Sequence, residues 1–263
     1  MMRIALVFVL AGCTAAQAPP PQQAAFPGGS LIDLTHTFDE NTPSWPTAPA
    51  FEMVPDFIGM TDGGYWYEAN TFRTSEHGGT HLDAPVHFAE GKHTNDQIPL
   101  ERLVAPAVMI DVTEASADPD YLISADDFIN WEAQHGPIPD GHIVLLRTGF
   151  ARFWPDRETY MGTAERGADA VPKLHFPGIA PEAAEWLVAN RNIAAIGLDT
   201  ASIDRGQSAD FMSHRILFAA NIPAFENVAD MSALPATGFS VIALPIKISG
   251  GSGGPLRIVA IVP

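Results

Sequence analysis

Residues 75–87 read Ser-Glu-His-Gly-Gly-Thr-His-Leu-Asp-Ala-Pro-Val-His and place three histidines and one aspartate within thirteen residues. Imidazole and carboxylate together are the ligand set of a borderline metal such as zinc. The two adjacent glycines disfavour a helix and permit a sharp bend, so we expect a turn that leads into a strand. In that strand His81 and Asp83 point to one face, and the bend brings His77 back towards them.

Three protein ligands are the number that a catalytic metal site uses when it keeps one position open. His77, His81 and Asp83 supply that number. His87 follows on the same strand parity and is close enough to act without being a ligand. A structural zinc site usually closes its shell with cysteines, whereas the only cysteine here is Cys13, far from the motif. The pattern therefore favours a catalytic site over a structural zinc or an incidental cluster.

Composition limits the classes of partner. The chain has 263 residues, of which 46% are hydrophobic, so one large core is possible in a single domain. Asp and Glu number 31 against 14 Lys and Arg, which gives a net charge of −17. With no basic patch to displace counterions, nucleic acid and anionic membrane surfaces are poor partners. An acidic surface says little about a small neutral substrate.

The first residues are typical of an export signal. Arg3 is followed by a short apolar run, too short to span a bilayer, and then by Leu-Ala-Gly-Cys13, which resembles the lipobox of bacterial lipoproteins. We therefore expect residues 1–13 to be a signal peptide with lipobox, and the mature protein to be periplasmic and held at the membrane only through a lipidated Cys13. The alternative is an ordinary signal peptide cleaved near Ala16 or Ala18.

The remaining chain divides into a tether and one domain. Residues 14–29 are rich in Ala, Pro and Gln and lack a face that could pack, so we expect a tether. Residues 30–263 contain no second linker and form the expected folded domain. No disulfide is possible with one cysteine, so the core must hold the fold.

Strand and helix patterns alternate along this domain. The expected strands, from alternating or continuous apolar residues, are 31–34, 69–74, 104–112, 143–147, 193–198, 241–244 and 257–262. Ser124 and Asp127 form a capping motif before a helix that Gly136 ends, and Pro181 begins a second helix that reaches Asn190. The alternation predicts an α/β fold. The glycine-rich residues 249–255 lack the lysine of a phosphate loop and predict a turn or flexible loop near the active site.

Candidates for further metal ligands lie between residues 199 and 226. A centre with two metal ions needs further ligands and a bridging carboxylate. Asp199, Asp204, His214 and Glu226 are candidates, and each alone is equally consistent with a cap, a turn or a surface position. Glu226 follows an apolar segment, where a carboxylate is unfavourable unless it is paired or bound to metal.

Residues 77–87 are similar to the signature His-x-Gly-Thr-His-x-Asp-x-Pro-x-His of the cyclase family, which includes bacterial kynurenine formamidases and isatin hydrolases. The similarity extends to Leu-Ile-Asp-Leu-Thr at 31–35, to Pro-Ser-Trp-Pro at 43–46, and to the spacing between His214 and Glu226. It covers essentially all of the chain after the tether.

The resemblance implies an α/β domain of the swivelling type in a homo-oligomer, a dimer or tetramer. It implies one or two Zn²⁺ ions, with Mn²⁺ possible. The implied roles are first-metal ligands His77, His81 and Asp83; bridging carboxylates Asp83 and Glu226; second-metal ligand His214; acid/base His87; and substrate-pocket wall Trp45.

Two activities fit this resemblance. The presence of both His214 and Glu226 favours the two-metal pattern of the formamidases, and hence hydrolysis of a carbon–nitrogen bond in an aryl amide, with Tyr65 and Trp66 as further ring partners unless Trp66 packs in the core. The alternatives are a cyclic amide, imide or lactone hydrolase like isatin hydrolase, or a periplasmic binding lipoprotein without turnover. Two features depart from the formamidases: the export signal, and Trp-Pro-Thr-Ala at 45–48 in place of Trp-Pro-Gly-Asp.

The lipobox predicts that an inhibitor of the lipoprotein signal peptidase blocks processing before Cys13. In a bacterial host, treated cells should accumulate the slower-migrating precursor, seen by immunoblot. Unchanged mobility and solubility would leave the ordinary signal peptide as the explanation.

Overall fold

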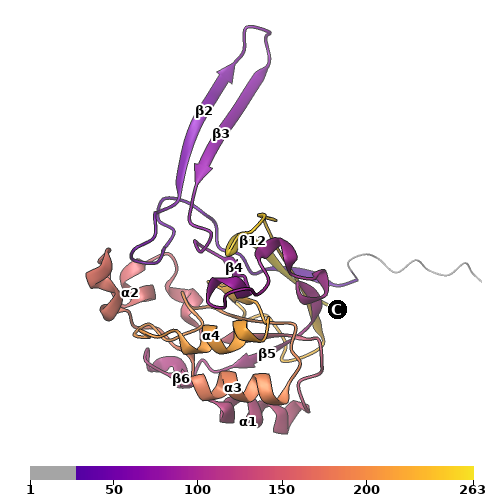
Figure 1. Cartoon of the computed structure of the whole chain (residues 1–263). Coiled ribbons are helices and arrows are strands. Elements are labelled where there is room, and N and C mark those ends of the chain that lie inside the picture. Colours follow the sequence, from indigo (N-terminus) through magenta and orange to yellow (C-terminus); the bar gives the residue numbers. More distant parts are fainter. Residues whose placement is uncertain (1–27) are drawn as a thin grey trace, which may run out of the picture.

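The computed structural model describes residues 28–263, which form a single-domain α/β fold (Figure 1). The predicted signal peptide at 1–13, with Cys13, and nearly all of the predicted tether at 14–29 lie outside the described residues. No helix within the described part of the chain has the length and apolar character needed to cross a membrane.

A mixed β-barrel forms the centre of the described domain. Its strands follow the order β12-β11-β5-β7-β9-β10-β4, and β4 pairs with β12 to close the circle, while β1 adds to the outer edge of β12. The bounds are β1 Ser30–Asp33, β4 His81–Asp83, β5 Val104–Asp111, β7 Ile143–Arg147, β9 Ala195–Leu198, β10 Ala224–Glu226, β11 Phe239–Pro245 and β12 Gly253–Val262. Pairing is parallel from β5 to β10 and antiparallel elsewhere in the barrel.

Successive side chains of the buried strands point to opposite faces of the sheet and contribute to two separate hydrophobic cores. Ile143 and Leu145 of β7 point into the barrel, whereas Val144 and Leu146 pack against helices on the outside. Those helices are α1 (Ala125–His135), α3 (Pro181–Asn190) and α4 (Met212–Ala219), which cover one side of the sheet in Figure 1. Parallel strands buried on both faces explain why the sequence shows continuous apolar runs there.

Both predicted helices are present. The Ser124 and Asp127 side chains form the reciprocal capping box of α1, and Gly136 follows its last residue. Pro181 occupies the first turn of α3, which ends at Asn190. A short helix, α2 (Arg157–Met161), and 3-10 turns at Pro85–His87, Asn95–Gln97, Leu100–Arg102, Ala115–Ala117, Phe150–Phe153 and Ala168–Lys173 complete the helical elements in the described part.

The strand predicted at 69–74 lies outside the barrel. It belongs to β3 (Trp66–Arg73), which pairs only with β2 (Glu52–Met60) in a hairpin that extends away from the domain (Figure 1). A second small sheet joins β6 (Leu122–Ile123) to β8 (Gly178–Ile179). The glycine-rich segment predicted as a turn does turn at 249–252, but from Gly253 it becomes the strand that pairs with β4.

Candidate metal centre

Strand β4 contains two of the site residues, His81 and Asp83. Its three residues are paired on both sides, with β10 and with β12, and are fully buried. His81 faces Glu226 directly across the antiparallel pair with β10. The Nε2 atom of His81 lies 3.0 Å from Asp83 Oδ1 and 3.4 Å from Glu226 Oε2. Barrel closure therefore brings together carboxylates that are 143 residues apart in sequence (226 minus 83).

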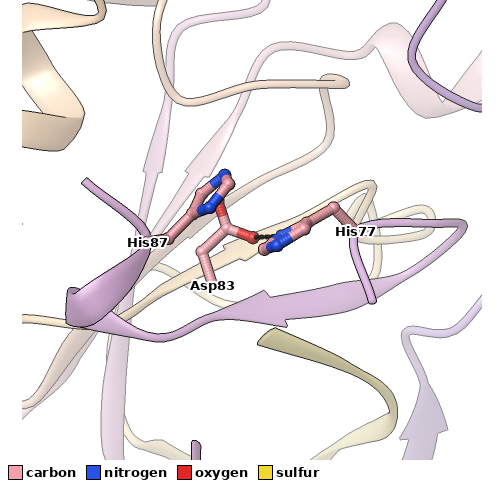
Figure 2. Close-up of side chains that lie close together, drawn as sticks. All are labelled: His77, Asp83 and His87. Atoms are coloured by element: carbon pink, nitrogen blue, oxygen red, sulfur yellow. Dashed lines mark hydrogen bonds and ion pairs between the residues drawn. The ribbon is translucent and has the colours of Figure 1, made fainter. Parts of the chain in front are cut away.

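The glycine bend places His77 as expected. Gly79 has φ of +60°, and a Cβ atom there would lie 2.4 Å from the Phe38 ring, so a side chain is excluded by both conformation and space. The chain returns so that His77 Nδ1 lies 2.6 Å from Asp83 Oδ1 (Figure 2).

Helix α4 brings the next ligand candidate from the other side. His214 Nε2 lies 3.2 Å from Asp83 Oδ2 and 3.1 Å from Glu226 Oε1. Its Nδ1–H donates to Asp204 at 2.6 Å, and Asp204 also accepts from the backbone N–H groups of Ser213 and His214. Asp204, ambiguous in the sequence, thus orients His214. Asp199 lies elsewhere, where it accepts hydrogen bonds from Thr148 and the following backbone.

His87 lies beside this cluster on a different element from the one predicted. The strand ends at Asp83, and Pro85 starts a 3-10 turn that ends at His87, so the expected strand parity was wrong. The His87 ring stacks on His77 with centroids 3.8 Å apart. Figure 2 shows His77, Asp83 and His87 converging, and one ligand atom from each lies within 4.8 Å of the others.

Hydrogen bonds fix which nitrogen of each histidine faces the carboxylates. His81 Nδ1–H donates to the Gly79 carbonyl at 2.8 Å, which leaves the lone pair of Nε2 facing inward. Ser252 Oγ donates to Glu76 at 2.6 Å and can accept from His77 Nε2–H at 2.9 Å, which turns the His77 Nδ1 lone pair inward. Outer partners of this kind orient metal-binding histidines. With His214 held by Asp204, three lone pairs face two carboxylates.

Such an arrangement requires positive charge at its centre. Asp83 and Glu226 are only 1% and 4% exposed, and a buried carboxylate is unfavourable without a cation or proton donor. Although burial opposes it, the carboxylates of Asp83 and Glu226 raise the pKa of His81 to about 10. Burial likewise opposes the shift at Asp83, yet the neighbouring histidines hold the pKa of its carboxyl well below the usual range.

A divalent cation would supply the positive charge that the two buried carboxylates require. His81 Nε2 is buried without a hydrogen-bond partner among the described residues, and it points to the space between the two carboxylates. Two groups share Asp83, namely His77 with His87 and His81 with Glu226, and His214 reaches both carboxylates. A shared carboxylate is the feature that two adjacent ions require.

A pocket opens onto this cluster. It has a volume of about 240 Å³ and is lined on its apolar side by Trp45, Phe88 and Phe211. Phe211 lies 5.1 Å from Phe88 and 6.1 Å from Trp45 between ring centroids. The backbone next to Trp45 is fixed by a residue outside the pocket. The Arg157 guanidinium donates a hydrogen bond to the Ser44 carbonyl at 2.6 Å.

Aromatic walls were only partly predictable. Trp45 lines the pocket as expected, whereas Tyr65 and Trp66 lie on the projecting hairpin with 63% and 59% exposure. The expectation that they wall the pocket, or that Trp66 packs in the core, was wrong. Phe88 and Phe211 were missed. The only signal was that Phe88 directly follows the histidine motif.

Comparisons with known proteins identify the family of this chain. The Putative cyclase family profile matches residues 32–205. The chain is 34% identical to isatin hydrolase of Roseibium aggregatum over 254 residues, which cover 89% of this chain and 92% of the relative. It is 26% identical to kynurenine formamidase of Salinibacter ruber over 236 residues, 88% of this chain and 96% of the relative.

The chain belongs to the cyclase family. It is a hydrolase of this family, like the isatin hydrolase and the kynurenine formamidase that it resembles. The structure of isatin hydrolase A from Ralstonia solanacearum superimposes with a TM-score of 0.81 at 31% identity and covers 94% of this chain and 100% of that one. An isatin hydrolase bound to the product analogue thioisatinate gives a TM-score of 0.79 at 32% identity, over 89% and 92% of the two chains.

Replacing His81 by Ala tests the ligand set. His81→Ala should remove the metal and reduce activity to background, because the central inward lone pair is lost while both buried carboxylates remain. Elemental analysis of the purified variant measures the metal. His175→Ala, at a histidine outside the pocket, is the control and should keep full occupancy. Normal metal content in His81→Ala would refute the assignment.

Proposed function

We propose that this hydrolase opens the carbon–nitrogen bond of a cyclic aryl amide of the isatin type. The observation that carries the proposal is the small pocket in which three aromatic side chains face the histidine and carboxylate cluster. Pockets for drug-sized ligands occupy about 300 to 1,000 Å³, so a cavity of about 240 Å³ suits a substrate of one or two rings. The similarity to isatin hydrolases over most of the chain supports the same class.

The pocket wall beside Trp45 also favours a neutral substrate. Ala48 lines the pocket at the position where the formamidase pattern has Asp. Without that carboxylate, this wall offers no partner for an amino group on the substrate. A flat neutral ring can instead lie against Trp45 and Phe211, since aromatic pairs prefer offset or tilted contacts.

The cluster residues have separate roles in this proposal. His77, His81, Asp83, His214 and Glu226 would hold one or two divalent ions, and Zn²⁺ and Mn²⁺ both suit this donor set. Such an ion lowers the pKa of bound water from about 15.7 toward 7 and polarises the substrate carbonyl. Asp204 and Ser252 hold the rings of His214 and His77 in position.

His87 is the proposed acid and base. Its ring lines the pocket beside His77 and makes no side-chain hydrogen bond within residues 28–263. It is therefore free to accept a proton from the attacking water and to deliver that proton to the leaving nitrogen. Proton transfer by a positioned side chain contributes about 10²- to 10⁴-fold to the rate.

A second candidate is hydrolysis of a linear aryl formamide. The observation that favours it is His214, whose Nε2 lies close to both carboxylates and so supports a second ion, as the formamidase pattern requires. We also propose that the protein is exported, anchored in the periplasm through Cys13 and active as a homo-oligomer. The leader sequence and the family resemblance support these points.

A substrate panel separates the candidates. The purified protein, loaded in turn with Zn²⁺ and Mn²⁺, is assayed by chromatography with isatin, N-formylkynurenine, a cyclic imide and an aryl ester. We expect kcat/KM for isatin to exceed that for N-formylkynurenine by at least about tenfold. The His81→Ala variant provides the background rate. A reversed preference would favour the formamidase, and no turnover with metal confirmed would favour a binding protein.

Replacing His87 by Ala tests the proton transfer. His87→Ala should keep its metal and lose about 10²- to 10⁴-fold in kcat, because the five proposed ligands remain while the acid and base is gone. Elemental analysis and steady-state kinetics are measured on the same sample. Normal turnover would end the acid and base role, and loss of metal would make His87 a ligand.

A further inference from the structure

The pocket wall that carries Trp45 lies outside the helices and strands of the domain. Residues 43–48, which we call the wall segment, contribute Trp45 and Ala48 to the lining of the pocket. Ser44 forms an isolated antiparallel bridge to Gly78 in the histidine motif, and the Ala48 N–H donates to the Trp45 carbonyl in a turn. Irregular backbone of this kind opens more easily than a strand, so the position of the Trp45 ring depends on contacts from other segments.

Two arginines donate hydrogen bonds to the wall segment. Arg157, the first residue of α2, donates from Nη1 to the Ser44 carbonyl at 2.6 Å. Arg166 donates from Nη1 to Ser44 Oγ at 3.1 Å and from Nη2 to the Ala48 carbonyl at 2.6 Å. Hydrogen bonds from a charged donor are stronger than those between neutral groups, and a planar guanidinium can direct two of them at once. The two guanidiniums therefore hold residues on both sides of Trp45.

The loop that supplies these arginines is itself fixed. Arg157 Nε and Nη2 donate to the Glu165 carbonyl at 3.3 and 3.2 Å, which joins the start of α2 to the end of this loop. The Gly167 N–H donates to the Pro46 carbonyl at 2.9 Å. Residues 157–167 and the wall segment therefore form one hydrogen-bonded unit.

Carbonyl and hydroxyl partners are unexpected for arginines in so acidic a chain. The sequence has 31 acidic residues against 14 basic ones, yet neither Arg157 nor Arg166 forms a salt bridge with a described residue. Glu165 pairs with Lys173 at 2.6 Å instead. Burial, and then the positive charge of Arg166, lowers the pKa of Arg157, so two like charges lie close together. The hydrogen bonds to the wall segment and to the Glu165 carbonyl offset this repulsion.

The arginines act on the pocket from outside it. Neither guanidinium lines the pocket, whereas Trp45 lines it and lies 6.1 Å from Phe211 between ring centroids. Ser44, which accepts from both arginines, is bridged to Gly78, the residue after His77. The wall segment thus connects the arginines to the bend that carries a proposed metal ligand. Contacts that fix the wall segment therefore fix the distance between the Trp45 ring and the metal centre.

We propose that Arg157 and Arg166 are positioning residues that set the substrate preference of the pocket by holding Trp45 at a fixed distance from the metal centre. A wall held in this way favours a flat ring that fits the pocket, and it disfavours a substrate whose flexible side chain needs the wall to move. The inference deepens the proposed function and rests on it, because it takes this pocket as the substrate site. It adds two specificity-determining residues that lie outside the pocket.

Hydrogen exchange tests the wall segment without any substrate. Amide exchange of the peptide that contains residues 42–48 is measured by mass spectrometry in Arg157→Ala, Arg166→Ala and the parent chain. We expect the amide of its turn to exchange at least about tenfold faster in both variants, in protein whose circular dichroism matches the parent chain. The control is Arg152→Ala, which removes a guanidinium that stacks on Phe153 and donates no side-chain hydrogen bond in the described part of the chain. It should leave the exchange unchanged.

Steady-state kinetics test the consequence for the substrate. In Arg157→Ala and Arg166→Ala, KM for isatin should rise about tenfold while kcat stays within about twofold, because the metal ligands and His87 are unchanged. The preference for isatin over N-formylkynurenine should fall by a similar factor, and Arg152→Ala should change neither value. Guanidinium ion at millimolar concentration, far below what unfolds a protein, should fill the space left in Arg157→Ala and restore KM. Rescue requires a folded protein, so a general loss of stability cannot produce this result.

Three results would overturn the proposal. The first is unchanged exchange of the wall segment in both arginine variants. The second is a KM for isatin within about twofold of the parent value in both variants, although the wall segment exchanges faster. The third is a fall in kcat that guanidinium ion does not restore, because that result indicates a merely structural role.

Failure of the proposed function gives different results. A parent chain that prefers N-formylkynurenine would overturn the isatin assignment alone, and the same comparison of KM is then made with that substrate. A parent chain that turns over none of the substrates would overturn the proposed function and the substrate preference with it. The exchange data still decide in that case whether the arginines hold the wall segment.

Discussion

The arrangement of the site depends on two carboxylates, Asp83 and Glu226, that are buried next to each other. Asp83 and Glu226 lie under 5% exposed at the join between β4 and β10, and the inward nitrogens of His77, His81 and His214 point at them. Lone pairs and carboxylates at such distances repel unless protons or metal ions lie between them. The barrel, the glycine bend and helix α4 each supply one side of this arrangement. The site therefore forms only when the barrel is closed and the glycine bend and helix α4 are in place.

Local sequence predicted those parts of the site that depend on local geometry. The Gly-Gly bend and the alternation of a strand fix the relation of His77, His81 and Asp83, which lie within seven residues. Glu226 was a candidate because a carboxylate after an apolar strand needs a partner. His214 entered through its resemblance to the family pattern. Their convergence depends on the pairing of β10 with β4 for Glu226 and on the position of helix α4 for His214, and periodicity encodes neither contact.

What the sequence did not predict lies where tertiary structure overrides local pattern. The His87 strand prediction failed because Pro85 begins a 3-10 turn. The strand at 69–74 was predicted correctly as a strand, but its partner is β2 rather than the barrel. Trp66 and Tyr65 are exposed on this hairpin, and the pocket takes its aromatic walls from Phe88 and Phe211 instead. A strand of an exposed apolar hairpin alternates in the same way as a strand with one buried face, so periodicity does not distinguish the two.

The central claim is that the carboxylate pair holds metal. The most direct measurement is an anomalous difference map from crystals of the full chain, collected at the absorption edges of zinc and manganese. The account predicts at least one peak at about 2.0 to 2.3 Å from a carboxylate oxygen of Asp83 and from the inward nitrogen of His81. The account would be contradicted if crystals grown with an excess of metal showed anomalous peaks only elsewhere and none between the carboxylates and the histidines.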